Sequence, residues 1–176
     1  VVMGLIMQVL EETVTEIGGD DLWGQVTDEA GVPEIYSRFD RYPGSDFLAV
    51  IEAVAKKLSV TIDEAMQLGG EKAFPHLLGR WPNGSDQYRD AVSLIADLDE
   101  VIHTEVKRWS PNSEPPGFDI TPDGDSYLVR YSSRRGLVSF CQGLLTGAFS
   151  YFGTPAKVEV ESTKGDVTEF RVTLTG

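Results

Sequence analysis

The sequence is poor in the residues that build disulfides and metal clusters. Its 176 residues include one cysteine, Cys141, and two histidines, His76 and His103. A single cysteine excludes an internal disulfide and a zinc site made of several cysteines. With two histidines and no His-x-x-x-His pair, a bare zinc or non-haem iron site is not expected either.

Basic residues and long apolar runs are also scarce. The chain has 15 Lys and Arg against 28 Asp and Glu, a formal net charge of -13. Nucleic acids and anionic membrane surfaces favour Lys and Arg, so neither is an expected partner. The apolar start has no basic leader and runs into Glu11-Glu12, unlike a signal peptide, and no apolar run approaches the length of a membrane span. We therefore expect a cytoplasmic protein.

The length of the chain suggests a single domain. Its first two thirds has the apolar periodicity of helices. Asp20 or Asp21 can cap the second helix, and Ser45 or Asp46 the third. Thr61 with Glu64 matches a capping box, and Gly69-Gly70 is expected to end the helix that follows. The expected helices span 5–17, a segment around 22–26, 47–58, 62–68, 74–78 and 88–109.

The last third changes to the alternating pattern of strands. Segments 118–121 and 127–131 form one expected hairpin, and 157–161 and 170–174 form another. An apolar helix over 137–152 separates them. We expect an α+β fold with a helical N-terminal subdomain and a C-terminal subdomain, whose four-stranded antiparallel sheet carries helices.

His103 lies beside an apolar stripe of the helix over 88–109, formed by Ala91, Ile95, Leu98, Ile102 and Val106. A neutral imidazole on such a surface can ligate the iron of a flat apolar cofactor. Haem requires as little as one protein ligand, which suits a chain with few histidines. Taken alone, a histidine in this setting is more often a packed core residue, and His76 is interpreted as structural or exposed.

A cluster of polar residues, Tyr131, Ser133 and Arg135, ends the strand over 127–131. Residues two apart on a strand face the same way, so the phenol, the hydroxyl and the guanidinium can converge on one anion. Arginine pairs with a carboxylate through two hydrogen bonds, and the hydroxyls add further bonds. The alternative is a strand end that is merely capped by polar side chains.

Together these features resemble the haem-nitric oxide/oxygen-binding family, H-NOX, which includes the haem domain of soluble guanylate cyclase. The resemblance covers essentially the whole chain, in family order and spacing. It rests on Met3-Gly4-Leu5-Ile6, Leu98-Asp99-Glu100-Val101-Ile102-His103, Pro115-Pro116, Tyr131-Ser132-Ser133-Arg134-Arg135 and Gly143-Leu144-Leu145-Thr146-Gly147.

The resemblance implies a haem b cofactor (iron protoporphyrin IX) between two subdomains, a distal one over about 1–65 and a proximal one over about 66–176. His103 is then the proximal iron ligand, and Tyr131, Ser133 and Arg135 bind the haem propionates. Pro116 is the residue that presses on the porphyrin, and Pro115, its neighbour, is the weaker candidate for that role.

The resemblance also bears on the gas that is bound. Family members that hold oxygen are similar in placing a tyrosine on the helix after the Tyr-x-Ser-x-Arg motif, and the matching residue here is Phe140, which has no donor. The other distal candidates are Leu144, Ile6 and Leu10. We therefore expect NO and CO as ligands and little binding of O2.

The family resemblance implies a sensor rather than an enzyme, which signals in trans to a histidine kinase or a diguanylate cyclase. Three alternatives stay open: an O2-binding haem protein, a haem enzyme such as a peroxidase, and a haem-free module for an apolar carboxylate ligand. The colour of the purified protein separates the haem-free module from the others, and peroxide turnover identifies the enzyme.

Overall fold

The computed structural model describes residues 2–80, 86–109 and 116–176, and of residues 102, 103 and 105–109 it describes the backbone alone. Four helices make up the N-terminal half: α1 (Gly4–Gly18), α2 (Asp20–Ala30), α3 (Gly44–Leu58) and α4 (Ile62–Leu78). A short antiparallel pair, β1 (Val2–Met3) with β2 (Arg41–Tyr42), ties the start of α1 to the segment before α3. This pair was not expected, because two-residue strands leave no alternating pattern.

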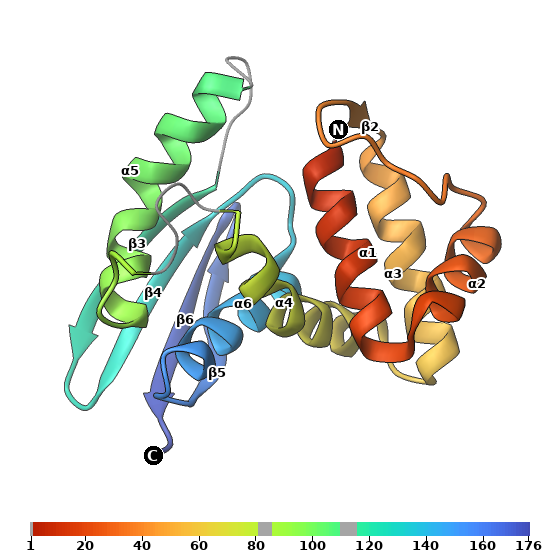
Figure 1. Cartoon of the computed structure of the whole chain (residues 1–176). Coiled ribbons are helices and arrows are strands. Elements are labelled where there is room, and N and C mark those ends of the chain that lie inside the picture. Colours follow the sequence, from red (N-terminus) through yellow and green to blue (C-terminus); the bar gives the residue numbers. More distant parts are fainter. Residues whose placement is uncertain (1, 81–85, 110–115) are drawn as a thin grey trace.

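The C-terminal half is built on a four-stranded antiparallel sheet (Figure 1). Its strands are β3 (Gly117–Asp123), β4 (Ser126–Ser132), β5 (Ala156–Lys164) and β6 (Val167–Leu174), in the order β3-β4-β6-β5. Helix α5 (Ala91–Trp109) lies against β3, and α6 (Val138–Tyr151) connects the two hairpins. The expected α+β fold and its sheet are confirmed.

Helix starts and ends follow local chemistry, with some corrections. The capping box is confirmed: the Thr61 N–H donates to Glu64 Oε2 at 2.8 Å, and the Glu64 N–H donates to Thr61 Oγ at 3.2 Å. The capping expected at Asp20 or Asp21 is wrong, because Gly19 is the N-cap and both acids lie in the first turn of α2. There they favour the helix through its dipole. The capping expected at Ser45 or Asp46 is also wrong, since α3 begins at Gly44 after Pro43.

Helix α4 is one continuous helix, although Gly69-Gly70 was expected to end it. The two glycines are buried, because α6 crosses α4 at this point. A Cβ on Gly70 would lie 2.2 Å from the Phe140 carbonyl oxygen, and one on Gly143 would lie 2.0 Å from that of Gln67. The glycines serve close packing of two backbones rather than a helix end, and tertiary contact outweighs their low helix propensity.

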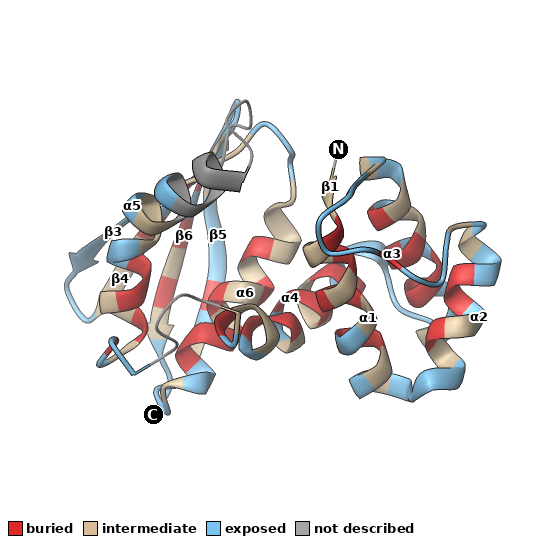
Figure 2. Cartoon of the chain, turned by 45° about the horizontal axis from the view of Figure 1, so that its top comes forward, coloured by how far each residue is buried: buried red, intermediate tan, exposed pale blue. Residues whose placement is uncertain are grey.

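Two groups of buried apolar side chains form the core. One joins α1, α2, α3 and the first part of α4, and includes Met7, Val50 and Ile51. The other joins the end of α4, α5, α6 and the sheet, and includes Phe149 and Phe170. In Figure 2 the buried segments of α4 lie between those of α1 and α6. Helix α4 therefore contributes to both cores.

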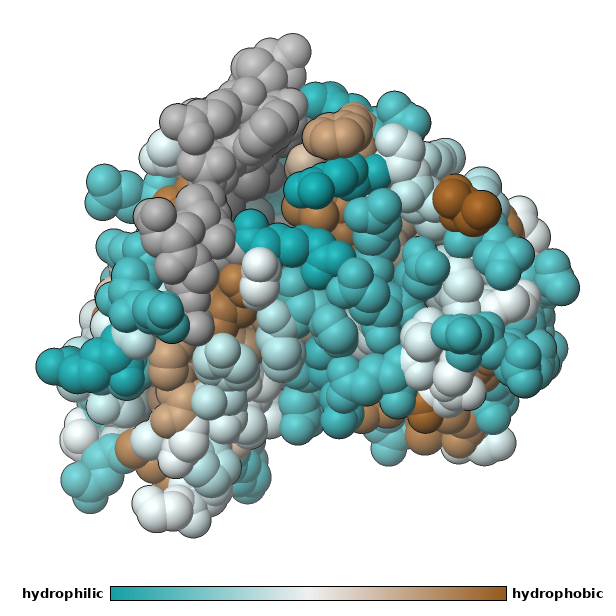
Figure 3. All heavy atoms as spheres, in the orientation of Figure 1, coloured by the Kyte–Doolittle hydropathy of each residue, from teal (hydrophilic) through white to brown (hydrophobic). Residues whose placement is uncertain are grey.

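The surface in Figure 3 is mostly hydrophilic, in keeping with the net charge of -13. Within residues 2–80, 86–109 and 116–176, no helix is both long and apolar enough to cross a membrane.

Replacement of Gly70 by alanine tests the helix crossing. The added methyl meets backbone, which cannot rotate away, so we expect Gly70→Ala to lower the free energy of unfolding by about 3 kcal/mol. Gly24→Ala in α2 is the matched control, because its nearest atom would be Glu34 Oε1 at 3.9 Å. Gly24→Ala should raise the free energy of unfolding by about 0.5–1 kcal/mol, because alanine has a higher helix propensity than glycine. Urea unfolding measures both, and equal effects would contradict this account of the crossing.

Candidate haem site

Helix α5, which carries His103, is anchored at its start and along one face. The Ser93 N–H donates to Asp90 Oδ1 at 2.8 Å, which caps the first turn. Ala91 and Ile95 are buried, and Leu98 packs against the same core, as the apolar stripe predicts. The Phe118 N–H donates to Asp99 Oδ1 at 3.2 Å and so joins α5 to β3. His103 lies within α5, but its side chain is outside the described part, so its role as a ligand stays a prediction.

Tyr131 sits in β4 with its ring between two phenylalanines. The ring centroids are 5.3 Å from Phe118 and 6.4 Å from Phe170, and the side chain is buried. Burial raises the pKa of the phenol, while a hydrogen bond with Ser133 and the charge of Arg135 act to lower it. The phenol is therefore neutral at ordinary pH and able to donate a hydrogen bond.

Ser133 and Arg135 lie beyond the strand rather than on it, so the expected alternation along one face does not apply to them. Strand β4 ends at Ser132, and the chain then turns. The Ser133 N–H donates to the Asp166 carbonyl at 2.8 Å, and the Arg135 N–H donates to Ser133 Oγ at 3.2 Å. This turn brings Ser133 and Arg135 near Tyr131, since both influence the pKa of its phenol. Arg135 is exposed and Ser133 half-buried.

Pro116 lies at the same end of the sheet. It precedes β3, whose first residue Gly117 pairs with Ser132, the residue before Ser133. Pro116 is half-buried, and Pro115 lies outside the described residues. The described part thus brings Pro116, Tyr131, Ser133 and Arg135 to one sheet end.

An apolar cavity of about 20 Å³ lies among four helices. Three of the predicted distal residues, Ile6, Leu10 and Phe140, line it. Phe140 packs edge-on against Phe47, with 5.5 Å between ring centroids. Leu144, the fourth predicted residue, does not line it and packs against the C-terminal core. The lining also includes four residues that the sequence reasoning missed, namely Val9, Phe47, Ala73 and Leu77.

The position of Ile6 in this cavity depends on Gly4. The Gly4 N–H donates to the Asp40 carbonyl at 2.9 Å, and a Cβ at Gly4 would lie 1.8 Å from the Ser37 carbonyl oxygen. Only glycine permits this approach of backbone to backbone, so Met3-Gly4-Leu5-Ile6 places the first turn of α1 against the segment before β2.

No tyrosine lines the cavity within the described part of the chain. Tyr36 and Tyr42 pack together with a centroid distance of 4.6 Å, and Trp23 lies 6.5 Å from Tyr36. Burial and the nearby Asp46 raise the pKa of Tyr36 to about 12, and its hydroxyl has no hydrogen-bond partner among the described residues. Tyr36 is therefore neutral within the N-terminal core.

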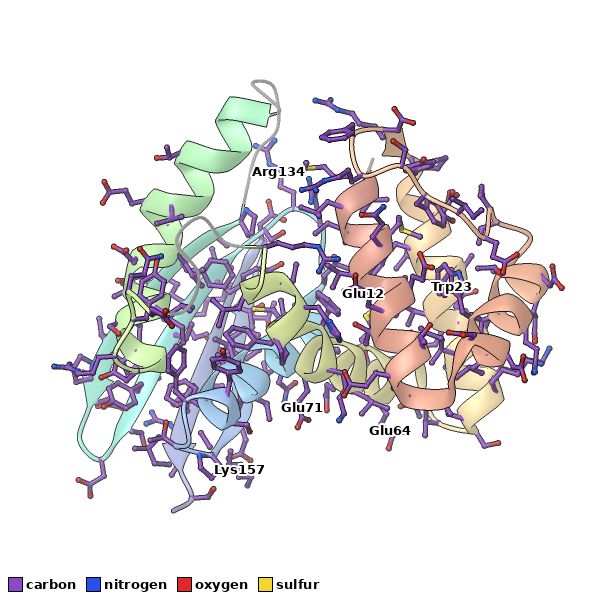
Figure 4. The ribbon with its side chains drawn as sticks, in the orientation of Figure 1. Glu12, Trp23, Glu64, Glu71, Arg134 and Lys157 are labelled. Atoms are coloured by element: carbon purple, nitrogen blue, oxygen red, sulfur yellow. The ribbon has the colours of Figure 1, made fainter. Side chains whose placement is uncertain are left out.

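A larger hollow of about 370 Å³ lies between α4, α6 and β5. Its lining includes the charged side chains of Glu64, Glu71 and Lys157, which Figure 4 labels. An apolar macrocycle does not suit such a surface, because burying these charges is costly. The apolar cavity and the sheet end carrying Tyr131 are the better candidates.

The residue chemistry fits haem in three respects. Apolar side chains from α1, α3, α4 and α6 can contact a porphyrin face, and a phenol, a hydroxyl and a guanidinium can hold its carboxylates. The helix that carries a histidine able to ligate iron, α5, packs on the same sheet. Haem, when bound, would supply the iron centre at which a diatomic gas is held.

Comparison with known proteins decides the family. The family model described as Haem-NO-binding matches residues 3–160. This chain belongs to the Haem-NO-binding, or H-NOX, family. The members of this family are haem-based gas sensors, and the resemblance seen in the sequence is confirmed.

Solved H-NOX structures superimpose on nearly the whole chain. An H-NOX protein from S. oneidensis, in an Fe(II)NO state, is 25% identical, with a TM-score of 0.85 over 99% of this chain and 100% of that one. One from K. algicida is 22% identical, with a TM-score of 0.79 over 99% and 97% of the two chains. An oxygen-binding H-NOX domain related to soluble guanylate cyclases is 17% identical, with a TM-score of 0.82 over 99% and 96%. The curated protein sequences contain no match.

Proposed function

We propose that this H-NOX domain is a sensor of NO that also binds CO and binds O2 poorly, through a ferrous haem b held by His103. Tyr131, Ser133 and Arg135 bind the haem carboxylates in this proposal, and Pro116 contacts the porphyrin, with Pro115 beside it. Family membership supports the haem, and the turn that gathers Tyr131, Ser133 and Arg135 supports the assignment of the carboxylate site.

The apolar cavity is the observation that carries the choice of gas. The seven residues that line it in the described part of the chain have apolar side chains, and none of them can donate a hydrogen bond. Bound O2 acquires partial negative charge that a donor must stabilise, whereas NO and CO bind ferrous iron without that help. The cavity therefore favours NO and CO over O2. It also offers no acid or base of the kind that a peroxidase needs.

The readout is proposed to occur in trans, to a histidine kinase or a diguanylate cyclase, by analogy with the family. The two subdomains, about 1–65 and about 66–176, are the parts proposed to move relative to each other. The two apolar cores support a division of this kind, because most of the N-terminal core lies before residue 66, and α4 connects the two parts by contributing to both cores. Gas binding acts as a switch only if it favours one arrangement over the other.

The absorption spectrum of the reduced protein in argon, in air and with NO tests the function. We expect haem in the purified protein, the same spectrum in argon and in air, and a new spectrum with NO or CO. A spectrum that changes reversibly in air would contradict the choice of gas. A colourless protein that takes up no added haem would contradict the haem function itself.

Phe140→Tyr tests the role of the apolar lining. The substitution places a hydroxyl donor in the cavity, so we expect air to change the spectrum of the reduced variant reversibly. Phe140→Leu is the control, since it alters packing around Phe47 but adds no donor. If the leucine variant responds to air as the tyrosine variant does, cavity shape rather than polarity sets the selectivity.

Arg135→Ala tests the carboxylate site. Loss of a bidentate guanidinium pair should weaken haem retention about tenfold or more, measured as the rate of haem transfer to an acceptor protein. Arg134→Ala is the matched control: it removes the same charge one residue away, from a side chain that is 76% exposed and 4.0 Å from Asp166. Equal haem loss in the two variants would remove Arg135 from the proposed site.

A further inference from the structure

Five ionisable residues connect α1 to α4 and to the turn that follows α4, beside the apolar cavity. We call this set the α1–α4 ion network. Lys72 lies 3.2 Å from Glu16, and His76 lies 3.0 Å from Glu16 and 3.2 Å from Glu12. Arg80 pairs with Glu12 through Nη2, and its Nη1 donates to the His76 carbonyl at 2.8 Å. The labelled Glu12 in Figure 4 lies on the side of α1 that meets α4.

Helix periodicity explains how five residues form one connected set. Glu12 and Glu16 are four residues apart on α1, as Lys72 and His76 are on α4, and Arg80 follows four residues after His76 in the turn beyond the end of α4. Residues at this spacing lie on one helix face. The three partners lower the pKa values of both carboxyls, chiefly through hydrogen bonds from Arg80 to Glu12 and from His76 and Lys72 to Glu16. Both glutamates are therefore charged near neutral pH.

The network joins the same two helices that form most of the cavity wall. Helix α1 contributes Ile6, Val9 and Leu10 to the lining, and α4 contributes Ala73 and Leu77. Each α4 lining residue directly follows a network residue, Lys72 or His76. A change in the separation of α1 and α4 would therefore change the width of the cavity.

A single exposed ion pair contributes little, but connected charges restrain one another. Here two carboxylates share the cationic side chains of Lys72 and Arg80 and the imidazole of His76, and His76 and Arg80 are only 29% and 24% exposed. Lys72, Glu12 and Glu16 are between 43% and 45% exposed, so the network is reachable by salt ions. It is suited to limiting an opening motion rather than to stabilising the whole fold.

We infer that the α1–α4 ion network controls how fast diatomic gases enter and leave the apolar cavity, by holding α1 against α4. This inference rests on the proposed function, because it assigns a kinetic role at the same site. The five residues are positioning residues, which act on the gas through the helices that carry the lining side chains.

The test compares Glu12→Gln/Glu16→Gln with Glu29→Gln. The double substitution keeps side-chain size but removes both network carboxylates. Glu29 is the matched control, since it pairs with Lys56 and Lys57 and joins α2 to α3, away from the cavity lining. Two measurements are made on each protein: the rate of CO binding after flash photolysis of the reduced haem protein, and hydrogen–deuterium exchange of the α1 backbone in the haem-free protein.

We expect the double variant to bind CO about threefold faster or more and to exchange α1 amides faster, with Glu29→Gln unchanged in both. High salt should shift the wild-type rate toward that of the double variant. Should the double variant fail to fold, Glu16→Gln alone removes the pairs with Lys72 and His76 and keeps Glu12 with Arg80.

Unchanged CO rates in a double variant with normal haem content would overturn the inference and leave the proposed function intact. Equal acceleration in Glu29→Gln would also overturn it, because general loosening of the helices would then explain the rates. A wild-type protein without haem would instead contradict the proposed function, and the inference would fall with it.

Discussion

The close contact between α4 and α6 is the constraint on which the rest of the structure depends. A Cβ on Gly70, Gly143 or Gly147 would come within 2.6 Å of a backbone oxygen of the facing helix. Glycine at these positions lowers the intrinsic stability of the helix. The close packing of the two backbones that glycine permits offsets this loss. The two helices then behave as one unit, which joins the N-terminal helices to the sheet.

This unit positions both the residues that line the apolar cavity and the polar sheet end. Phe140 contributes its carbonyl to the helix contact and its ring to the cavity, and Ala73 and Leu77 follow Gly70 on α4 and line the same cavity. The turn that carries Ser133 and Arg135 leads directly into α6. A change in the position of α6 would therefore disturb the cavity and the proposed carboxylate site together. In a sensor, such coupling allows a small change at the gas site to reach the surface.

The sequence predicted the helices and strands that have a clear apolar periodicity. It missed the features that depend on contacts between distant parts of the chain. Alternation in β4 and β6 predicted the sheet, and the apolar stripe predicted the buried face of α5. Gly69-Gly70 was interpreted as a helix end, because its partner glycines lie more than seventy residues away. That error also hid Ala73 and Leu77, which are cavity residues only if α4 continues through the glycines. For His103, sequence and family are the basis of the assignment.

The size and the polarity of the cavity act together. A volume of about 20 Å³ has room for about one water molecule, but a water held there needs polar partners that the lining side chains do not offer. The cavity is therefore expected to stay dry, and an entering diatomic has no bound water to displace. Polar groups must then lie outside the lining, and the charges of Glu12, Glu16 and their partners do so, close to water. If this chain senses gas as proposed, a dry cavity leaves helix separation, rather than desolvation, as the step expected to limit gas entry.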